Sequence, residues 1–297
     1  YIPEFDNITV STAYIDKKSQ NKEKVVEAKN KIKIYNLLNY TSGLTYGNFG
    51  NSFAKKRLRS SEISKLNLED ISLKKYVKEL AKFPLAYNPN TVWEYGRSIE
   101  VLGRVIEIAS NKTLDVFLKD KIFKPLDMID TSFYVEKSKW HRIAEPFKDK
   151  QPKLISIREK PNFLTGGHGL VSTIDDYMKF CMMFLKKGKV NKNSILSRKT
   201  IEYMTSNHLG NNISRDTPLY LPGPGYGFGL GFAVRESNGL SSWPGSKGEY
   251  FWAGYAGTYF WIDPKEELIV ISMTQSVTNR MKFRLLLRNL VYQAIIN

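Results

Sequence analysis

The segment from Glu249 to Asp263, EYFWAGYAGTYFWID, combines seven aromatic residues with Gly254 and Gly257. Glycine weakens the interior of a strand, and it is found there mainly where a ligand or another backbone comes close. An aromatic-rich packed strand would account for Phe260 and Trp261, but it would leave both glycines unexplained. The segment therefore predicts that something approaches the backbone here.

Residues that commonly carry covalent or metal chemistry are few and dispersed. Cys181 is the one cysteine, and it lies in the apolar helical stretch DDYMKFCMMFL, where a buried structural thiol is expected rather than a nucleophile. His141 and His208 have no partner pattern, so no Ser-His-Asp triad is predicted. With three histidines and one cysteine dispersed, we predict no metal site and no cofactor.

The composition is that of a globular protein, and it limits the partners. The 297 residues are 42% hydrophobic and 13% aromatic, enough to bury a sizeable core in one large or two smaller domains. The net charge of +16 is compatible with nucleic-acid binding, but the basic residues are spread along the chain without a nucleic-acid-binding motif. No apolar run reaches the length of a membrane span. We predict no nucleic-acid partner and no stable membrane insertion, and the compartment and oligomeric state stay open.

The hydrophobic period divides the chain into a mainly helical part, residues 1–205, and an antiparallel sheet with a C-terminal helix, residues 206–297. LEDISLKKYVKELAKF and SIEVLGRVIEIAS carry apolar residues at helical spacing. STIDDYMKFCMMFLKKG predicts a third helix, which opens with Ser172 three residues before Asp175, as in a capping box, and stops at Gly188.

The second part changes to the period of strands. GYGFGLGFAVRE alternates glycine with aromatic or apolar residues from Gly225 onward and predicts a strand. GTYFWIDPKEELIVISMTQ predicts a hairpin around Pro264, and NRMKFRLLLRNLVYQAII predicts an amphipathic helix.

Five segments together resemble, in order, the serine β-lactamase-like family: IKIYNLLNYTSGLTYG, PNTVWEYGRSIEVLGRVIEIAS, IFKPLDMIDTSF, GGHGLVSTIDDYMKF and AGTYFWIDPKEELIVISMTQ. They are most similar to the esterase branch related to class C β-lactamases and D-alanyl-D-alanine carboxypeptidases. The resemblance covers Tyr1 to about Leu287. It implies an α/β (α+β) fold of the β-lactamase/penicillin-binding-protein type, with an antiparallel sheet flanked by helices and a mainly helical domain.

The family uses three boxes: Ser-x-x-Lys for the nucleophile, a Tyr or Ser box for proton transfer, and a strand box such as Lys-Thr-Gly. A serine hydroxyl is a poor nucleophile until a neighbouring base takes its proton. The resemblance assigns the second box to Tyr95, which follows Pro89 in a loop and precedes a helix from Ser98. Arg97 stands where the lactamase branch has an asparagine, and it either contacts substrate or points to solvent.

The resemblance assigns the third box to Trp252, Ala253 and Gly254, with the backbone amide of Tyr255 as the expected oxyanion donor. A side chain at Gly254 would then obstruct the acyl group. Trp252 replaces the lysine that would hold a β-lactam carboxylate, which favours an uncharged ester or amide substrate. His168, in the GGHGL loop, either reaches the acyl pocket or is simply tolerated on a flexible loop.

The first box has no convincing match. The resemblance places YIPEF after the Ser-x-x-Lys helix, so the chain is expected to begin just after its nucleophile, with the first helix and early strands upstream. The internal matches at Ser19 and Ser72 are interpreted as chance matches.

We therefore predict that the intact protein is a serine hydrolase that cleaves an ester through an acyl-enzyme, at a site between its two parts. A β-lactamase or carboxypeptidase, an acyltransferase, and an inactive homologue that binds cell wall or a partner are the alternatives.

Overall fold

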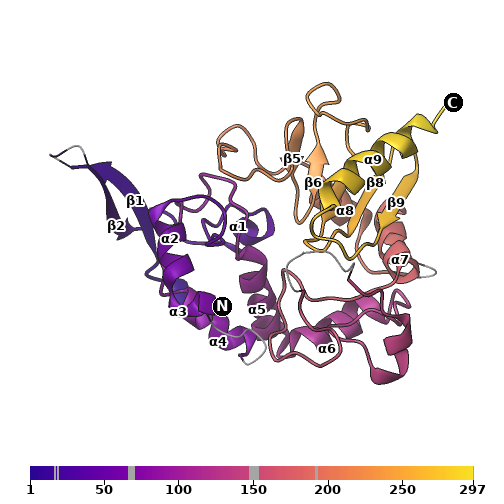
Figure 1. Ribbon diagram of the computed structural model, residues 1–297, viewed down its shortest axis with the longest axis horizontal. Helices are drawn as coiled ribbons and strands as arrows, with labels where there is room; N and C mark the ends of the chain where they lie inside the picture. The colour runs from indigo at the N-terminus through magenta and orange to yellow at the C-terminus, as the bar shows by residue number, and fades with distance from the viewer. Residues whose placement is uncertain (17, 19, 66–70, 147–153, 191–192, 297) are drawn as a thin grey trace. The chain divides into compact units, whose positions relative to one another are not determined.

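The computed structural model describes residues 1–16, 18, 20–65, 71–146, 154–190 and 193–296 (Figure 1). The chain folds into two compact units that alternate along the sequence. Unit 1 comprises Tyr1–Phe117, Pro161–Gly167 and Leu209–Leu221, and unit 2 comprises Leu118–Lys160, His168–His208 and Pro222–Asn297. The sequence predicted one boundary, after residue 205, where the hydrophobic period changes. That division of the chain stays a prediction.

Unit 1 opens with a short 3₁₀ helix, Pro3–Phe5, and an antiparallel hairpin of β1 (Thr9–Ile15) and β2 (Asn21–Glu27). The sequence did not predict this hairpin, because β2 is polar and mostly exposed and shows no alternation. The helices follow in order: α1 (Ile34–Leu38), α2 (Phe53–Ser60), α3 (Glu62–Lys65), α4 (Leu73–Leu80) and α5 (Ser98–Ser110).

Helices α4 and α5 are the two predicted from apolar spacing in this part of the chain. α4 buries Leu73, Tyr76, Val77 and Leu80 on one face. α5 covers the whole of SIEVLGRVIEIAS, packs against α1 and α4, and ends at Asn111, whose φ of 53° is left-handed. These contacts fix the N-terminus of α5, and with it the loop that carries Tyr95.

Unit 2 is built on an antiparallel five-stranded sheet in the order β5-β6-β7-β8-β9. Its strands are β5 (Tyr226–Phe228), β6 (Ala233–Arg235), β7 (Tyr250–Ala253), β8 (Tyr259–Asp263) and β9 (Leu268–Ser272). The hairpin of β8 and β9 around Pro264 is confirmed. The prediction of one strand after Gly225 was wrong, because the chain turns near Gly231, which has a φ of 97°, and forms two paired strands.

Seven further helical or strand elements and the C-terminal helix complete the described part of the chain. They are α6 (Leu114–Leu118), a π-helical turn (Lys119–Phe123), a 3₁₀ helix (Lys137–Arg142), α7 (Ile174–Leu185), the pair β3 (Lys189–Val190) and β4 (Asn193–Ser194), α8 (Arg198–Met204) and α9 (Arg280–Gln293). The cap of α7 lies one residue later than predicted, since Thr173 Oγ1, not Ser172, accepts from Asp176 N at 3.2 Å.

The two faces of the sheet pack against different helices. Successive side chains of a strand point to opposite faces, and on β8 Phe260 and Ile262 join the buried cluster that includes Cys181 of α7. Tyr259 and Trp261 point to the other face, where Arg284 and Arg288 of α9 lie over their rings. Figure 1 shows α9 beside the strands of this sheet. Cys181 is fully buried, as predicted, and burial raises the pKa of its thiol to about 12.

Helix α9 turns its cationic face inward. The sequence predicted an amphipathic helix, yet Arg288 is 1% exposed and pairs with Glu249 at 2.7 Å, whereas Phe283, Leu286 and Leu290 are exposed. The cationic face consists of Arg280, Arg284 and Arg288, which are four residues apart and lie over the rings of Tyr255, Tyr259 and Trp261 respectively. Among the described residues, no helix is both long and apolar enough to cross a membrane.

Candidate active site

Tyr95 occupies a tightly held corner of unit 1, as its position before α5 predicts. On its N-terminal side, Trp93 is fully buried and its backbone N–H donates to Ser214 O at 2.9 Å, while Glu94 N donates to Tyr40 O at 2.9 Å. On its C-terminal side, a Cβ at Gly96 would lie 2.1 Å from Leu44 O, so only glycine fits there. The backbone around Tyr95 therefore has little freedom.

Aromatic rings surround the Tyr95 phenol. Its ring centroid lies 5.4 Å from that of Tyr40, 5.2 Å from Tyr46, 6.2 Å from Phe49 and 6.3 Å from Trp93. Burial raises the pKa of Tyr95 above its ordinary value. The phenol is therefore neutral near pH 7 and can donate a proton. To act as a base it needs a further cation beside its hydroxyl.

Arg97 does not point to solvent. Its guanidinium donates to Glu100 Oε1 at 3.0 Å and lies 4.3 Å from the ring centre of Tyr46. Glu100 is fully buried, and Tyr46 also donates to its Oε1, at 3.3 Å. Glu100 was not among the residues predicted from sequence, although the Arg97–Glu100 spacing of three residues at a helix start is typical of an ion pair.

The third box spans the end of β7 and the start of the turn to β8 in unit 2, with Trp252 and Ala253 in β7 and Gly254 in the turn. Gly254 N donates to Thr258 O at 2.8 Å, and Gly257 N donates to Gly254 O at 3.2 Å. A Cβ at Gly254 would lie 2.0 Å from Thr258 Oγ1, and one at Gly257, whose φ is 112°, would lie 2.2 Å from Thr274 Oγ1. Gly257 is required by its left-handed backbone, and a Cβ at Gly254 would displace the Thr258 hydroxyl. Neighbours within unit 2 therefore account for the close approach that the sequence predicted.

Tyr255 follows directly in this turn. Its side chain is 59% exposed, and the guanidinium of Arg280 lies 4.9 Å from its ring centre. Within the part of the chain that the structure describes, the Tyr255 N–H donates no hydrogen bond. A backbone N–H without a partner is available to a ligand oxygen.

The other predicted binding residues differ in their exposure. Trp252 is half-buried, lies 5.3 Å from Phe228 in an edge-to-face contact, and packs against the buried cluster around α7. Ala253 pairs with Tyr259 at the end of β7. His168 is exposed. Contact between substrate and any of these three residues stays a prediction.

The Ser-x-x-Lys match at Ser72 has a structural explanation. Ser72 caps α4, and its Oγ accepts from the backbone N–H of Lys75 at 3.3 Å. A capping serine stabilises the first turn of a helix, which accounts for its presence without catalysis. The match at Ser19 lies outside the described residues.

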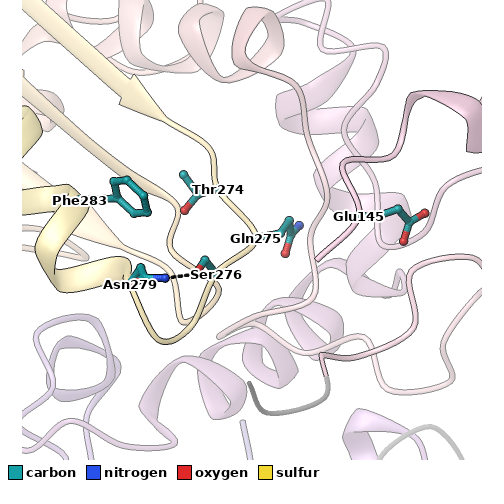
Figure 2. Close-up of a pocket in the computed structure, with 6 residues that line it drawn as sticks. All are labelled: Glu145, Thr274, Gln275, Ser276, Asn279 and Phe283. Carbon is teal, nitrogen blue, oxygen red and sulfur yellow. Dashed lines mark hydrogen bonds between the residues drawn. The ribbon is translucent and has the colours of Figure 1, made fainter. Parts of the chain in front are cut away.

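Unit 2 also contains a cavity of about 290 Å³ lined by a segment that contacts the turn between β7 and β8. Figure 2 shows its lining residues, which are Glu145, Thr274, Gln275, Ser276, Asn279 and Phe283. Ser276 N donates to Ala256 O at 2.8 Å and so joins this segment to the turn. None of the residues predicted from sequence lines the cavity.

Comparison with known proteins gives consistent matches. The model of the Beta-lactamase family matches residues 7–293. Protein Rv1367c of Mycobacterium tuberculosis is 29% identical over 84% of this chain, and the chain spans 63% of that protein's length. Esterase EstB of Burkholderia gladioli is 32% identical over 46% of this chain, and the match covers 35% of the length of EstB.

A solved structure shares the fold. It is described as EstCE1, a hydrolase with promiscuous acyltransferase activity, and it superposes with a TM-score of 0.72 at 25% identity. The superposition covers 89% of this chain and 73% of EstCE1. The helices and antiparallel sheet of this chain therefore confirm the predicted β-lactamase/penicillin-binding-protein-like fold.

Proposed function

Because the chain belongs to the Beta-lactamase family, we propose that it forms the larger part of a serine hydrolase that cleaves esters through an acyl-enzyme. The observation that carries the proposal is the turn after β7, where the Tyr255 N–H has no partner among the described residues. A fixed backbone donor stabilises the oxyanion of acyl transfer without reorganisation.

Tyr95 is the proton-transfer residue of this proposal. Its corner is held by backbone hydrogen bonds on one side and by Gly96 on the other, so its phenol has a defined position. The raised pKa of Tyr95 means that a cation beside the hydroxyl must assist it as a base. The lysine of a Ser-x-x-Lys box supplies such a cation in the mechanism that we propose.

The nucleophile of the proposal is a serine outside residues 1–297. Ser72 serves as a helix cap, and the chain spans about two thirds or less of the length of the curated relatives described above. The chain as given should then show neither ester turnover nor labelling of Ser72.

The proposed substrate is an uncharged ester. Trp252 stands in the place of a cationic residue, and its half-buried ring packs against Phe228. A short-chain p-nitrophenyl ester should therefore exceed a chromogenic cephalosporin in kcat/KM. Faster hydrolysis of the cephalosporin would instead favour a β-lactamase.

Substitution of Tyr95 in the full-length protein tests this function. Tyr95→Phe should lower kcat for a p-nitrophenyl ester about a hundredfold, the usual contribution of general acid–base catalysis. The matched control is Tyr14→Phe, at an exposed tyrosine of β1, which should retain turnover. Retention of activity within a few-fold in Tyr95→Phe would remove Tyr95 from the mechanism. Absence of turnover in the unsubstituted full-length protein would favour a binding homologue.

Acyl transfer is the second candidate, and it rests on the described acyltransferase activity of EstCE1. The same acyl-enzyme can pass its acyl group to water or to an alcohol. Product analysis with added alcohol separates the two: an alkyl ester as the main product would identify a transferase, and free acid would identify a hydrolase.

A further inference from the structure

Arg284 lies in the middle of the cationic face of α9 and contacts backbone rather than a carboxylate. Its guanidinium donates to Gly254 O and, at 3.1 Å, to Thr258 O. Within the described residues Arg284 forms no ion pair, whereas Arg288, one turn later, pairs with Glu249.

The two carbonyls that Arg284 contacts stand on either side of the turn between β7 and β8. Gly254 and Thr258 are already paired through the 2.8 Å hydrogen bond from Gly254 N to Thr258 O. A single terminal nitrogen of Arg284 therefore connects both sides of the turn to α9. Hydrogen bonds from a charged donor are roughly twice as strong as neutral ones, so this connection adds rigidity.

The Gly254 carbonyl and the Tyr255 N–H belong to the same peptide group. The peptide is planar and trans, so its N–H points away from its C=O. Fixing Gly254 O consequently fixes the direction of the Tyr255 N–H. Gly254 has no side chain to restrict rotation of this peptide. Gly257 N already donates to the Gly254 carbonyl at 3.2 Å, and Arg284 adds a second restraint, which is charged and comes from outside the turn.

The charge of Arg284 also makes the Tyr255 N–H a stronger hydrogen-bond donor. A hydrogen bond accepted by an amide oxygen polarises the amide and strengthens the hydrogen bond that its N–H donates by about 10–30%. The guanidinium is held here at an electrostatic cost, because burial and then neighbouring Arg280 lower the pKa of Arg284. An apolar side chain would cover the sheet without this cost, yet Leu286 and Leu290 of the same helix are exposed.

We propose that Arg284 is a positioning residue that orients and polarises the Gly254–Tyr255 peptide, so that the Tyr255 N–H can stabilise an oxyanion. The catalytic consequence rests on the proposed function, whereas the orientation of the peptide can be measured without turnover.

Selective isotope labelling reports on this one peptide. The dipeptide Gly-Tyr occurs twice in residues 1–297, at Gly225–Tyr226 and Gly254–Tyr255. In protein labelled with ¹³C-carbonyl glycine and ¹⁵N-tyrosine, each such pair gives an HNCO cross-peak. Tyr255→Phe assigns the second peak by removing it, and the Tyr226 peak shows whether unit 2 is folded.

Arg284→Met should shift both the Gly254 carbonyl and the Tyr255 amide resonances, because the carbonyl loses its charged donor. The matched control is Arg280→Met, since Arg280 lies over the Tyr255 ring and does not contact the peptide. It should leave the Gly254 carbonyl resonance in place. If Arg284→Met does not fold, Arg284→Lys, which keeps the charge but not the planar fork, is measured by the same criterion.

Kinetics of the full-length protein test the catalytic part. Loss of an oxyanion donor costs about 10²–10³ in kcat, and misorientation of the donor should cost about tenfold, with KM nearly unchanged. An unmoved Gly254–Tyr255 cross-peak in a folded Arg284 variant would overturn the inference. A shifted cross-peak with unchanged kcat would support the orientation of the Gly254–Tyr255 peptide by Arg284. It would also show that the Tyr255 N–H is not the oxyanion donor. Absence of turnover before any substitution would count against the proposed function, and the cross-peak would still decide the role of Arg284.

Discussion

The Arg97 guanidinium donates a hydrogen bond to Glu100 Oε1 at 3.0 Å, and the Glu100 side chain is fully buried. Arg97→Met would leave this carboxylate without its cation, and removal of one partner of a buried pair typically costs about 3 kcal/mol or more. We expect a decrease of that size in the free energy of unfolding, measured by denaturant titration. Adding Glu100→Gln should recover part of it. Unchanged stability together with a raised KM would show instead that Arg97 binds substrate.

The Arg288–Glu249 pair should stabilise unit 2 in the same way. Arg288 is 1% exposed and Glu249 is fully buried. Arg235 Nε stays 3.4 Å from Glu249 Oε1 in the variant, so Arg288→Met should lower the free energy of unfolding by about 3 kcal/mol, the lower end of the cost of breaking a buried pair. The control is Lys265→Met, at an exposed lysine 3.5 Å from Glu266, which should change stability by no more than about 0.5 kcal/mol. Equal effects of the two substitutions would contradict the importance of the buried pair.

The requirement for glycine at residue 254 should depend on Thr258. Gly254→Ala places a Cβ 2.0 Å from Thr258 Oγ1, so we expect clear destabilisation in thermal unfolding. Thr258→Ala removes that oxygen, and the double variant should regain most of the lost stability. If the double variant is no more stable than Gly254→Ala alone, a contact other than Thr258 imposes the glycine.

The buried tyrosines of unit 1 should make it less stable at alkaline pH. Burial raises the pKa values of Tyr40, Tyr46 and Tyr95. Above pH 10 the unfolded chain loses phenolic protons that the folded chain retains, so the stabilisation is complete below pH 10 and is lost as pH rises further. Unfolding measured at pH 8 and at pH 10.5 should show this loss. Tyr95→Phe should make it smaller, and an identical loss in both proteins would mean that Tyr95 titrates normally.

The sequence predicted the elements whose apolar residues show a clear period. α4, α5 and the hairpin of β8 and β9 lie where their patterns place them. It missed the hairpin of β1 and β2, because the exposed polar strand β2 carries no period that distinguishes it from a loop. It also missed the turn near Gly231, since alternation continues on both sides of it.

The candidate site was only partly accessible to sequence reasoning. The local segments that resemble the family's boxes were enough to identify Tyr95, Gly254 and Tyr255. In the structure, all three lie in backbone held by close contacts or hydrogen bonds of their neighbours. Glu100 and Arg284 act through contacts that local patterns do not specify. The contacts of Arg284 could not be predicted because the amphipathic pattern of α9 suggests that its leucines, rather than its arginines, face the sheet.

Covalent labelling by a fluorophosphonate probe, followed by mass-spectrometric location of the label, tests the central claim most directly. A serine hydrolase of this type reacts at the serine that forms its acyl-enzyme. In the full-length protein we expect one labelled serine in a Ser-x-x-Lys sequence that is neither Ser19 nor Ser72, with weaker labelling in Tyr95→Phe. A label on Ser72, or ester turnover without any labelled serine, would contradict the account.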